Sequence, residues 1–455
     1  MKRRFLLFLL AAVISFPCEA RAADQQSLAQ GRSLYQAGKL VEAEELLAEA
    51  LAAIDAGKLS QNLLGQCLSP LSEIYRTWGK NEKALDIAKR YQTFLNGQTG
   101  GDLKQRDKTL SETAMTIGDL LSALGRYDEA EQAIAQSIAL DKKHGERDLI
   151  ERLKTDVRLA RIADAREDAD QSKTRWQTVG TTATSAMEAI QQGKLASKYS
   201  PDCLNAFATS QVTLGQLDAA IAAQRKLRTF YAKQADVAAA MRATLELAKL
   251  TAMAHDYAAA KSTLDDAISI ADKKNLHGEI KGDLLCQRAA IALLQGRHAE
   301  SKKDLREAAV QYTKPLYSLP PPQPSQTMSL FAKLQSTYQQ AGEFSAAIAA
   351  GTKLLKIREE RLGNEHPQTV AALTDLGSVF GAIGDYARAK PLLTQALDYW
   401  RKYKPSQPLQ VARVLNDLGV VERATGSYAD AEKCFAEALA IRQRILKPDD
   451  TRLAY

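Results

Sequence analysis

The sequence lacks the residue patterns of the common enzyme active sites. It contains no H-E-x-x-H, no G-x-S-x-G and no glycine-rich phosphate-binding loop. Its five histidines are scattered, with none at metal-ligand spacing and none beside a cysteine: His144, His255, His277, His298 and His366. These absences exclude the usual zinc, serine-hydrolase and nucleotide sites, so we expect no catalytic residue, no bound metal and no cofactor.

Aromatic residues, proline and net charge are also low. Aromatics make up 6% of the 455 residues and only 13 residues are proline, which suits an all-helical protein. The formal charge is +7, of which the first 22 residues contribute +3. The remaining positive charge is dilute and forms no basic stripe interleaved with aromatic residues, so we expect no nucleic-acid partner.

The N-terminus carries an apolar run of 12 residues, Phe5 to Phe16, interrupted only by a serine. It is too short to cross a membrane, which takes about 20 residues, so we expect no transmembrane helix there. A basic segment, Lys2-Arg3-Arg4, precedes it, and the small-x-small pattern Ala20-Arg21-Ala22 follows it. We expect residues 1–22 to be a cleaved signal peptide and the protein to be exported, either periplasmic or extracellular. A lipid anchor at Cys18 is the alternative, but bulky residues precede that cysteine.

The stretch from His366 to Leu439 contains the clearest pattern in the chain. Laid over itself with an offset of 42 residues, its marker residues coincide. The matching pairs are Leu376 and Leu418, Gly377 and Gly419, Gly384 and Gly426, Tyr386 and Tyr428, Ala389 and Ala431, Leu393 and Phe435, and Ala396 and Ala438. Such regularity indicates two copies of one supersecondary unit stacked together.

Each copy is typical of two helices around a tight turn. In the last copy, apolar residues at helical spacing predict a first helix from about Gln410 to Thr425 and a second from about Ala429 to Ile445. Gly426 suits the left-handed position that ends the first helix. The small residues Gly419 and Ala431 are expected where the two helix axes cross closely.

This combination of small residues at fixed points with a large one between them resembles the tetratricopeptide repeat, whose usual unit is about 34 residues. The 42-residue period, with Glu365-His366-Pro367 before the first helix and Leu415-Asn416-Asp417-Leu418-Gly419 within it, is similar to the kinesin-light-chain variety. The resemblance implies an all-α, right-handed α-solenoid of about ten antiparallel helix pairs, with the first helix of each pair lining the concave side.

The remaining chain divides around this pattern. We expect repeats 1–3 over residues 23–142, repeats 5–7 over 199–313 and repeats 8–10 over 326–446, with a tail at 447–455. Residues 143–198 have lost the markers; a degenerate helical hairpin fits there, and a bend or docking site is the alternative. Prolines at 314–325 predict a stiff linker between the seventh and eighth pairs. The four cysteines after the leader, Cys67, Cys203, Cys286 and Cys434, lie in four different hairpins, which argues against disulfides.

The register of the repeat family places polar side chains on the inward face of the first helices. These are Asn205 and Thr209 in the fifth pair, Ser336 and Gln339 in the eighth, Thr374 and Ser378 in the ninth, and Arg413, Asn416 and Arg423 in the tenth. Amide side chains can donate to and accept from the backbone of an extended peptide. The resemblance implies that role for asparagine; Asn416 matches it closely, whereas Thr374 replaces the equivalent asparagine one copy earlier. The arginines favour acidic partners.

We therefore interpret the chain as an exported, non-enzymatic scaffold that binds a protein or an extended peptide in its groove. The alternative is a self-assembling structural component of a cell-envelope complex, in which arrays associate with one another. An enzyme with its active site in residues 148–198 is a third hypothesis, but that region offers many carboxylates and no partnered nucleophile.

Overall fold

The computed structural model describes residues 25–77, 80–98, 102–143, 148–166, 169–276, 278–318, 322, 324–403 and 408–445. The expected signal peptide and the C-terminal tail lie outside them. Every regular element in this part of the chain is a helix, as the repeat pattern predicts. Among these residues, no helix combines the length and the apolar character needed to cross a membrane.

Residues 25–36 form a helix that precedes α2. The other α-helices are α2 (Leu40–Asp55), α3 (Leu64–Thr77), α4 (Asn81–Asn96), α5 (Leu103–Ala123), α6 (Tyr127–Lys142), α7 (Leu149–Ala165), α8 (Ala169–Gln191), α9 (Ser200–Thr213), α10 (Leu217–Lys233), α11 (Val237–Met253), α12 (Tyr257–Lys273), α13 (Glu279–Leu294), α14 (His298–Leu316), α15 (Pro324–Gln340), α16 (Phe344–Leu362), α17 (Pro367–Ala382), α18 (Tyr386–Tyr403), α19 (Pro408–Ala424) and α20 (Tyr428–Ile445). Single 3-10 turns precede α3 (η1, Gln61–Leu63) and α9 (η2, Ser197–Tyr199).

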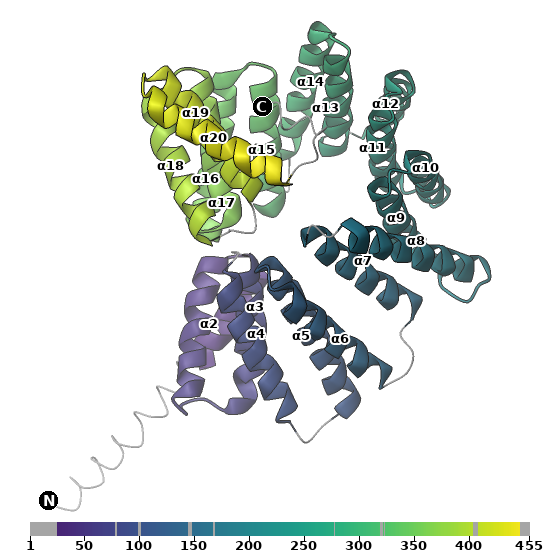
Figure 1. Ribbon diagram of the computed structural model, residues 1–455, viewed down its shortest axis with the longest axis vertical. Coiled ribbons are helices and arrows are strands. Elements are labelled where there is room, and N and C mark those ends of the chain that lie inside the picture. The colour runs from purple at the N-terminus through teal and green to yellow at the C-terminus, as the bar shows by residue number, and fades with distance from the viewer. Residues whose placement is uncertain are drawn as a thin grey trace, which may run out of the picture.

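The helices pack in consecutive pairs, from α3 with α4 to α19 with α20 (Figure 1). The turn inside the last two pairs is closed by Gly384 and Gly426, whose φ angles are +80° and +84°. A left-handed backbone at this point costs an L-residue about 1–2 kcal/mol, which explains why glycine recurs there with the 42-residue period. The predicted all-α solenoid is confirmed, and the predicted boundaries of the last hairpin differ from α19 and α20 by at most two residues.

The small residue expected at the helix crossing is also found, at Gly419. A Cβ atom added to Gly419 would lie 2.7 Å from Phe435 Cε1, so it is the Phe435 ring that requires a glycine on α19. Phe435 therefore packs within its own hairpin. Tyr428, which also recurs with the period, is 71% exposed and fills no gap between pairs.

Residues 143–198, expected to be a degenerate hairpin, contain the helix pair α7 and α8, which lacks the repeat markers. α7 and α8 pack against each other, and small residues on both helices are fully buried between them, among them Ala160, Ala163 and Ala183. The threonines of α8 do not break it, because Thr178 and Thr181 donate to the carbonyl four residues earlier, at 3.0 Å each. The markers are missing because alanines in a different register do the same packing.

The proline-rich segment is shorter than predicted. α14 continues to Leu316 and contains Pro315 in its last turn, and α15 begins at Pro324. A proline in the last turn is tolerated here because its ring packs against another element: a Cβ on Gly278 would lie 3.0 Å from Pro315 Cγ. Lys314 and Pro315 therefore belong to the seventh hairpin and not to the linker.

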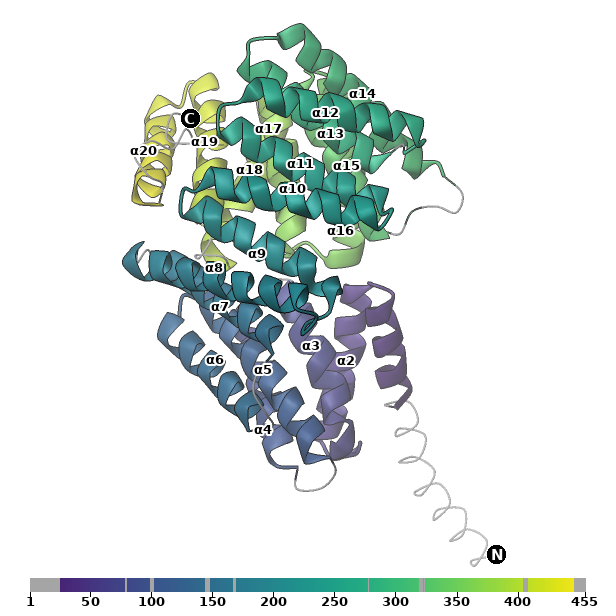
Figure 2. The same ribbon diagram turned by 90° about the vertical axis from the view of Figure 1, so that its right-hand side faces the viewer.

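The array curls back on itself, a feature that the repeat pattern did not predict. α2 of the first hairpin contacts α16 of the eighth, and in both views the N-terminal hairpins lie below α16 (Figures 1 and 2). Lys80 Nζ lies 3.0 Å from Glu365 Oε2 across this contact. Beside it, a Cβ on Gly363 would lie 3.5 Å from Val41 Cγ2. One turn of the superhelix therefore brings the two halves of the chain together.

The cysteines lie in four different hairpins, as predicted, on α3, α9, α13 and α20, and all four are free. Cys67 and Cys203 are fully buried, and burial raises the pKa of each thiol to about 11. Cys286 and Cys434 are only partly buried. The buried pair behaves as small apolar residues at helix contacts.

Ala235 offers a test of the tight connections. It joins α10 to α11 with φ at +57°, a conformation that alanine adopts at a cost. We expect Ala235→Gly to raise the free energy of unfolding by about 0.5–1 kcal/mol, since relief of strain exceeds the entropy that glycine adds to the unfolded chain. Urea denaturation measures the change. Ala232→Gly, in the last turn of α10, is the matched control. Its free energy of unfolding should fall by a similar amount, because glycine destabilises a helix.

Candidate functional site

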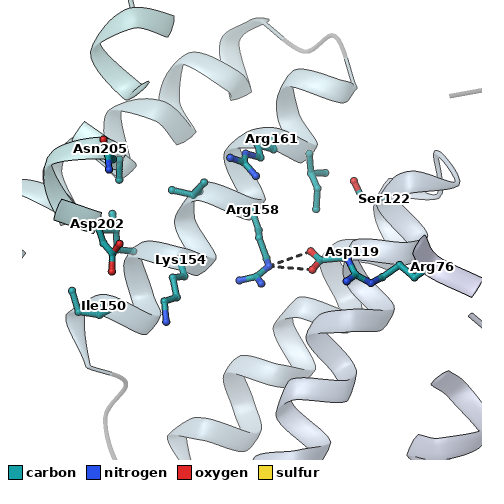
Figure 3. A pocket seen from close by; sticks show the side chains of 13 residues that line it. Arg76, Asp119, Ser122, Ile150, Lys154, Arg158, Arg161, Asp202 and Asn205 are labelled. Atoms are coloured by element: carbon teal, nitrogen blue, oxygen red, sulfur yellow. Dashed lines mark hydrogen bonds and ion pairs between the residues drawn. The ribbon is translucent and has the colours of Figure 1, made fainter. Parts of the chain in front are cut away.

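The first helices of hairpins two to five line a cavity of about 590 Å³, which we call the four-helix cavity. α3 contributes Arg76, α5 contributes Asp119 and Ser122, and α9 contributes Asp202 and Asn205. α7 provides the longest wall: Ile150, Leu153, Lys154, Val157, Arg158, Arg161 and Ile162. Figure 3 shows the charged side chains entering from three sides. The volume lies in the range of ligand pockets.

A second cavity of about 970 Å³ lies between α5, α6 and α7 and is called the three-helix cavity. It exists because α6 and α7 barely touch, whereas the equivalent helices at the other junctions pack closely. Lys154, Arg158 and Asp119 line both cavities. These three residues therefore mark the boundary between the two spaces.

The local sequence explains how α7 presents its cations. Asp148 caps the helix by accepting hydrogen bonds from the backbone N–H groups of Ile150 and Glu151, at 2.8 and 2.9 Å. From that fixed start, Lys154, Arg158 and Arg161 follow at spacings of four and three residues, which places them on one face of the helix. A single helix thus directs three positive side chains toward the groove.

The ion pairs of the four-helix cavity are exposed. Arg158 Nε lies 3.1 Å from Asp119 Oδ1, and the two side chains are 35% and 42% exposed (Figure 3). Lys154 Nζ donates to Glu151 at 2.7 Å, and this hydrogen bond raises the pKa of the lysine. Arg161 is exposed and has no ion-pair partner among the described residues. The cavity therefore holds one free cation and several that are loosely paired.

The groove residues predicted in the fifth and eighth pairs lie in different parts of the structure. Asn205 lines the four-helix cavity, where its side-chain oxygen accepts from Gln224 Nε2 at 3.4 Å. Thr209 is exposed one turn further along α9. Ser336 is exposed and Gln339 half-buried on α15, outside both cavities. Of these four, only Asn205 is placed in a cavity.

Three of the predicted residues of the ninth and tenth pairs form one polar cluster between α17 and α19. Ser378 donates a hydrogen bond to Asp417, and Asn416 also hydrogen-bonds this carboxylate. Arg413 pairs with Asp375 at 2.5 Å, so its charge is balanced within the protein. Asp375 was missed because its partner lies one repeat away in the sequence.

Thr374 and Arg423 lie outside this cluster. Thr374 is 1% exposed, and its hydroxyl donates to the Val370 carbonyl at 3.1 Å. It packs inside the hairpin and does not face a groove, which corrects its assignment as a binding residue. A threonine at this position satisfies its own hydroxyl within the helix, which an asparagine would not do as easily. Arg423 is exposed near the end of α19.

Asp417 leads to a pH-dependent prediction. Burial raises the pKa of its carboxyl, although hydrogen bonds and Arg413 oppose the change. A raised pKa means that the folded state holds the proton more tightly than the unfolded chain, so this group destabilises the fold as pH rises above the ordinary aspartate range, about 4. We expect Asp417→Asn to melt higher than the wild type at pH 7 and to match it at pH 3. Asp398→Asn, at an exposed position of α18, should change neither melt.

Most of the cavity was not predicted residue by residue. Arg76, Asp119, Lys154 and Asp202 come from four different helices and share no sequence motif. One signal was present: the charged stretch that begins at Arg158, in the region where a docking site was the alternative to a degenerate hairpin. Among the described residues, no group of histidine, cysteine and carboxylate side chains is arranged to hold a metal ion.

Comparison with known proteins identifies the repeats. Models of the tetratricopeptide repeat match residues 111–144, 328–402 and 411–451. No curated protein matches the sequence. BtubC (BKLC) from P. vanneervenii is a similar solved structure, with 19% identity, a TM-score of 0.40, and coverage of 52% of this chain and 95% of its own.

Two further solved structures are similar over a larger part of the chain. A Rap protein complexed with Competence and Sporulation Factor has 12% identity, a TM-score of 0.39, and coverage of 93% of this chain and 99% of its own. A tetratricopeptide repeat protein from Parabacteroides merdae ATCC 43184 has 15% identity, a TM-score of 0.39, and coverage of 70% and 99%. The three sequence matches fall on α5–α6, α15–α18 and α19–α20, the helix pairs of the structure. The chain is therefore a tetratricopeptide-repeat protein, built as an α-solenoid.

Proposed function

We propose that the protein is an exported, non-enzymatic scaffold that holds a segment of another protein in the four-helix cavity. The observation that carries the proposal is that the first helices of four successive hairpins line one continuous space. Such a space runs across the helices and suits an extended chain better than a compact ligand. Asn205 and the arginine and lysine side chains offer donors along it, and Val157 and Ala206 offer partly exposed apolar surface.

Loose packing between α7 and the third hairpin also supports a binding surface here. α7 meets hairpin three mainly through side chains, and the open junction beside α6 leaves space on both sides of Arg158. Elsewhere in the array the neighbouring hairpins pack along their lengths. A segment bound here would replace water in an existing space, so the protein would not need to unfold a packed interface.

The test uses a bulky residue to fill the cavity. Peptides that bind the protein would be selected from a displayed random library. Fluorescence anisotropy would then compare their affinities for the wild type and for Ser122→Trp. Ser122 lines the cavity and is half-buried, so an indole there should obstruct an extended segment and weaken binding about tenfold or more.

Thr229→Trp is the control, because Thr229 is exposed on α10 and lines neither cavity. Circular dichroism melts would show that both variants are folded. If no selected peptide distinguishes Ser122→Trp from Thr229→Trp, the cavity is not the binding site and the proposal fails.

Export is a separate part of the proposal and is supported by the basic, apolar and small-residue pattern of residues 1–22. Mass spectrometry of the protein recovered from cells checks it. Export predicts a mature N-terminus at Ala23. An N-terminus at Met1 in the cell-associated protein, with none released, would contradict it.

A further inference from the structure

We infer that the segment held in the four-helix cavity is acidic, and that Asp119 occupies part of its site when the cavity is empty. This inference rests on the proposed function, because it names the chemistry of the partner at the same site. It goes beyond a generic peptide groove in two respects. It assigns a sign of charge to the ligand, and it assigns a competing role to one residue of the protein.

The charges of the two cavities give the first argument. Four cationic and two carboxylate side chains line the four-helix cavity, whereas four cationic and six carboxylate side chains line the three-helix cavity. The two spaces share Asp119, Lys154 and Arg158, so the difference arises from the residues that they do not share. An acidic segment is therefore attracted to the four-helix side and repelled from the other, which gives it a defined location.

The cations of the four-helix cavity are unpaired or only loosely paired. Arg161 points into the cavity region without an ion-pair partner among the described residues (Figure 3). Arg76 and Lys154 pair with Glu73 and Glu151 one helical turn away, in contacts whose side chains are all more than 40% exposed. Exposed pairs of this kind contribute little to stability, so a ligand carboxylate can replace the internal partner.

Asp119 gives the third argument. Its carboxylate reaches from α5 to Arg158 of α7, with Arg158 Nε donating to both oxygens at 3.1 and 3.3 Å. A ligand carboxylate would accept hydrogen bonds from the same guanidinium. Because both partners are more than a third exposed, an incoming acidic residue can take the place of Asp119. Asp119 is thus an internal competitor, and its removal should favour the ligand.

The experiment uses labelled octapeptides of glutamate, of lysine and of alternating glycine and serine, measured by fluorescence anisotropy at low and at physiological ionic strength. We expect the glutamate peptide to bind the wild type and the other two to bind much more weakly. Arg161→Gln should weaken glutamate-peptide binding about two- to fivefold, the effect of one exposed ion pair. Asp119→Asn should strengthen it by a similar factor.

Arg228→Gln is the matched control, since Arg228 is exposed on α10, has no ion-pair partner among the described residues, and lines neither cavity. It changes the net charge as Arg161→Gln does and should leave binding almost unchanged. Melting curves confirm that each variant is folded.

Three results would overturn the inference: equal losses for Arg161→Gln and Arg228→Gln, equal binding of the lysine and glutamate peptides, or no gain in Asp119→Asn. Each of them leaves the proposed function standing if library peptides still lose binding in Ser122→Trp. If Ser122→Trp has no effect on any peptide, the proposed function fails first.

Discussion

Gly282→Leu is expected to destabilise the protein by about 3 kcal/mol, the upper part of the range for overpacking a core. A Cβ atom at this position of α13 would lie 2.4 Å from Tyr312 Cε1, far inside contact distance. The ring cannot move aside easily, because Tyr312 is 2% exposed and its hydroxyl donates to Asp283 Oδ1 at 2.8 Å. The better helix propensity of leucine, worth about 0.8 kcal/mol, offsets only part of the clash.

Thermal and urea denaturation measure this effect, with Gly97→Leu as the matched control. Gly97 is exposed and has a φ of −76°, and a Cβ there would lie 3.5 Å from the carbonyl oxygen of Phe94, an ordinary contact. The control should melt within a degree or two of the wild type. Equal melting of Gly282→Leu and Gly97→Leu would show that α13 and α14 do not cross where the structure places them.

Arg288→Met is expected to lower the free energy of unfolding by about 2–3 kcal/mol, because it leaves a buried carboxylate unpaired. Arg288 Nε and Nη2 donate to both oxygens of Asp304, at 2.8 and 2.7 Å, and Nη1 donates to Asp265 at 2.8 Å. The Asp304 side chain is only 7% exposed, so removal of the guanidinium leaves a buried carboxylate without its charge partner. That penalty is larger than the favourable energy of the pair itself.

The double variant Arg288→Met with Asp304→Leu separates the penalty of an unpaired buried carboxylate from the favourable energy of the ion pair. Since the buried charge is removed together with its partner, most of the stability should return. Arg306→Met is the control for the loss of an ordinary ion pair: Arg306 Nε lies 2.7 Å from Glu343, but its side chain is 58% exposed, and the loss should stay below about 1 kcal/mol. A double variant less stable than Arg288→Met alone would contradict the argument.

The residues that could be predicted from sequence are those whose role is decided within one hairpin. Gly384, Gly426 and Gly419 recur because a left-handed turn and a close helix crossing each demand glycine locally. The helix boundaries around them follow from the same short-range periodicity. The fourth hairpin can form without the marker residues because burial of Ala160 and Ala183 depends on side-chain volume and not on the marker spacing.

For the groove residues, the repeat register predicted the face of the helix but not the burial or the charge balance of each side chain. The register placed Asn205 on the inward face of its helix, where the structure has the four-helix cavity, but it could not show that Thr374 is buried or that Arg413 is neutralised by Asp375. The charge balance of Arg413 depends on the neighbouring hairpin, whose rotation is set by the fit of side chains across the contact. A register assigns a face of a helix, whereas charge balance and exposure on that face depend on the next repeat.

The sequence by itself determined that this protein is a helical-repeat array, because the 42-residue period and the turn glycines are local properties of each unit. Only the tertiary structure decided that α2 meets α16, that α6 and α7 stay apart, and that two cavities open beside Arg158. Small rotations between successive hairpins accumulate along a solenoid. The position of distant hairpins is therefore a sum over many contacts, and no single repeat encodes it.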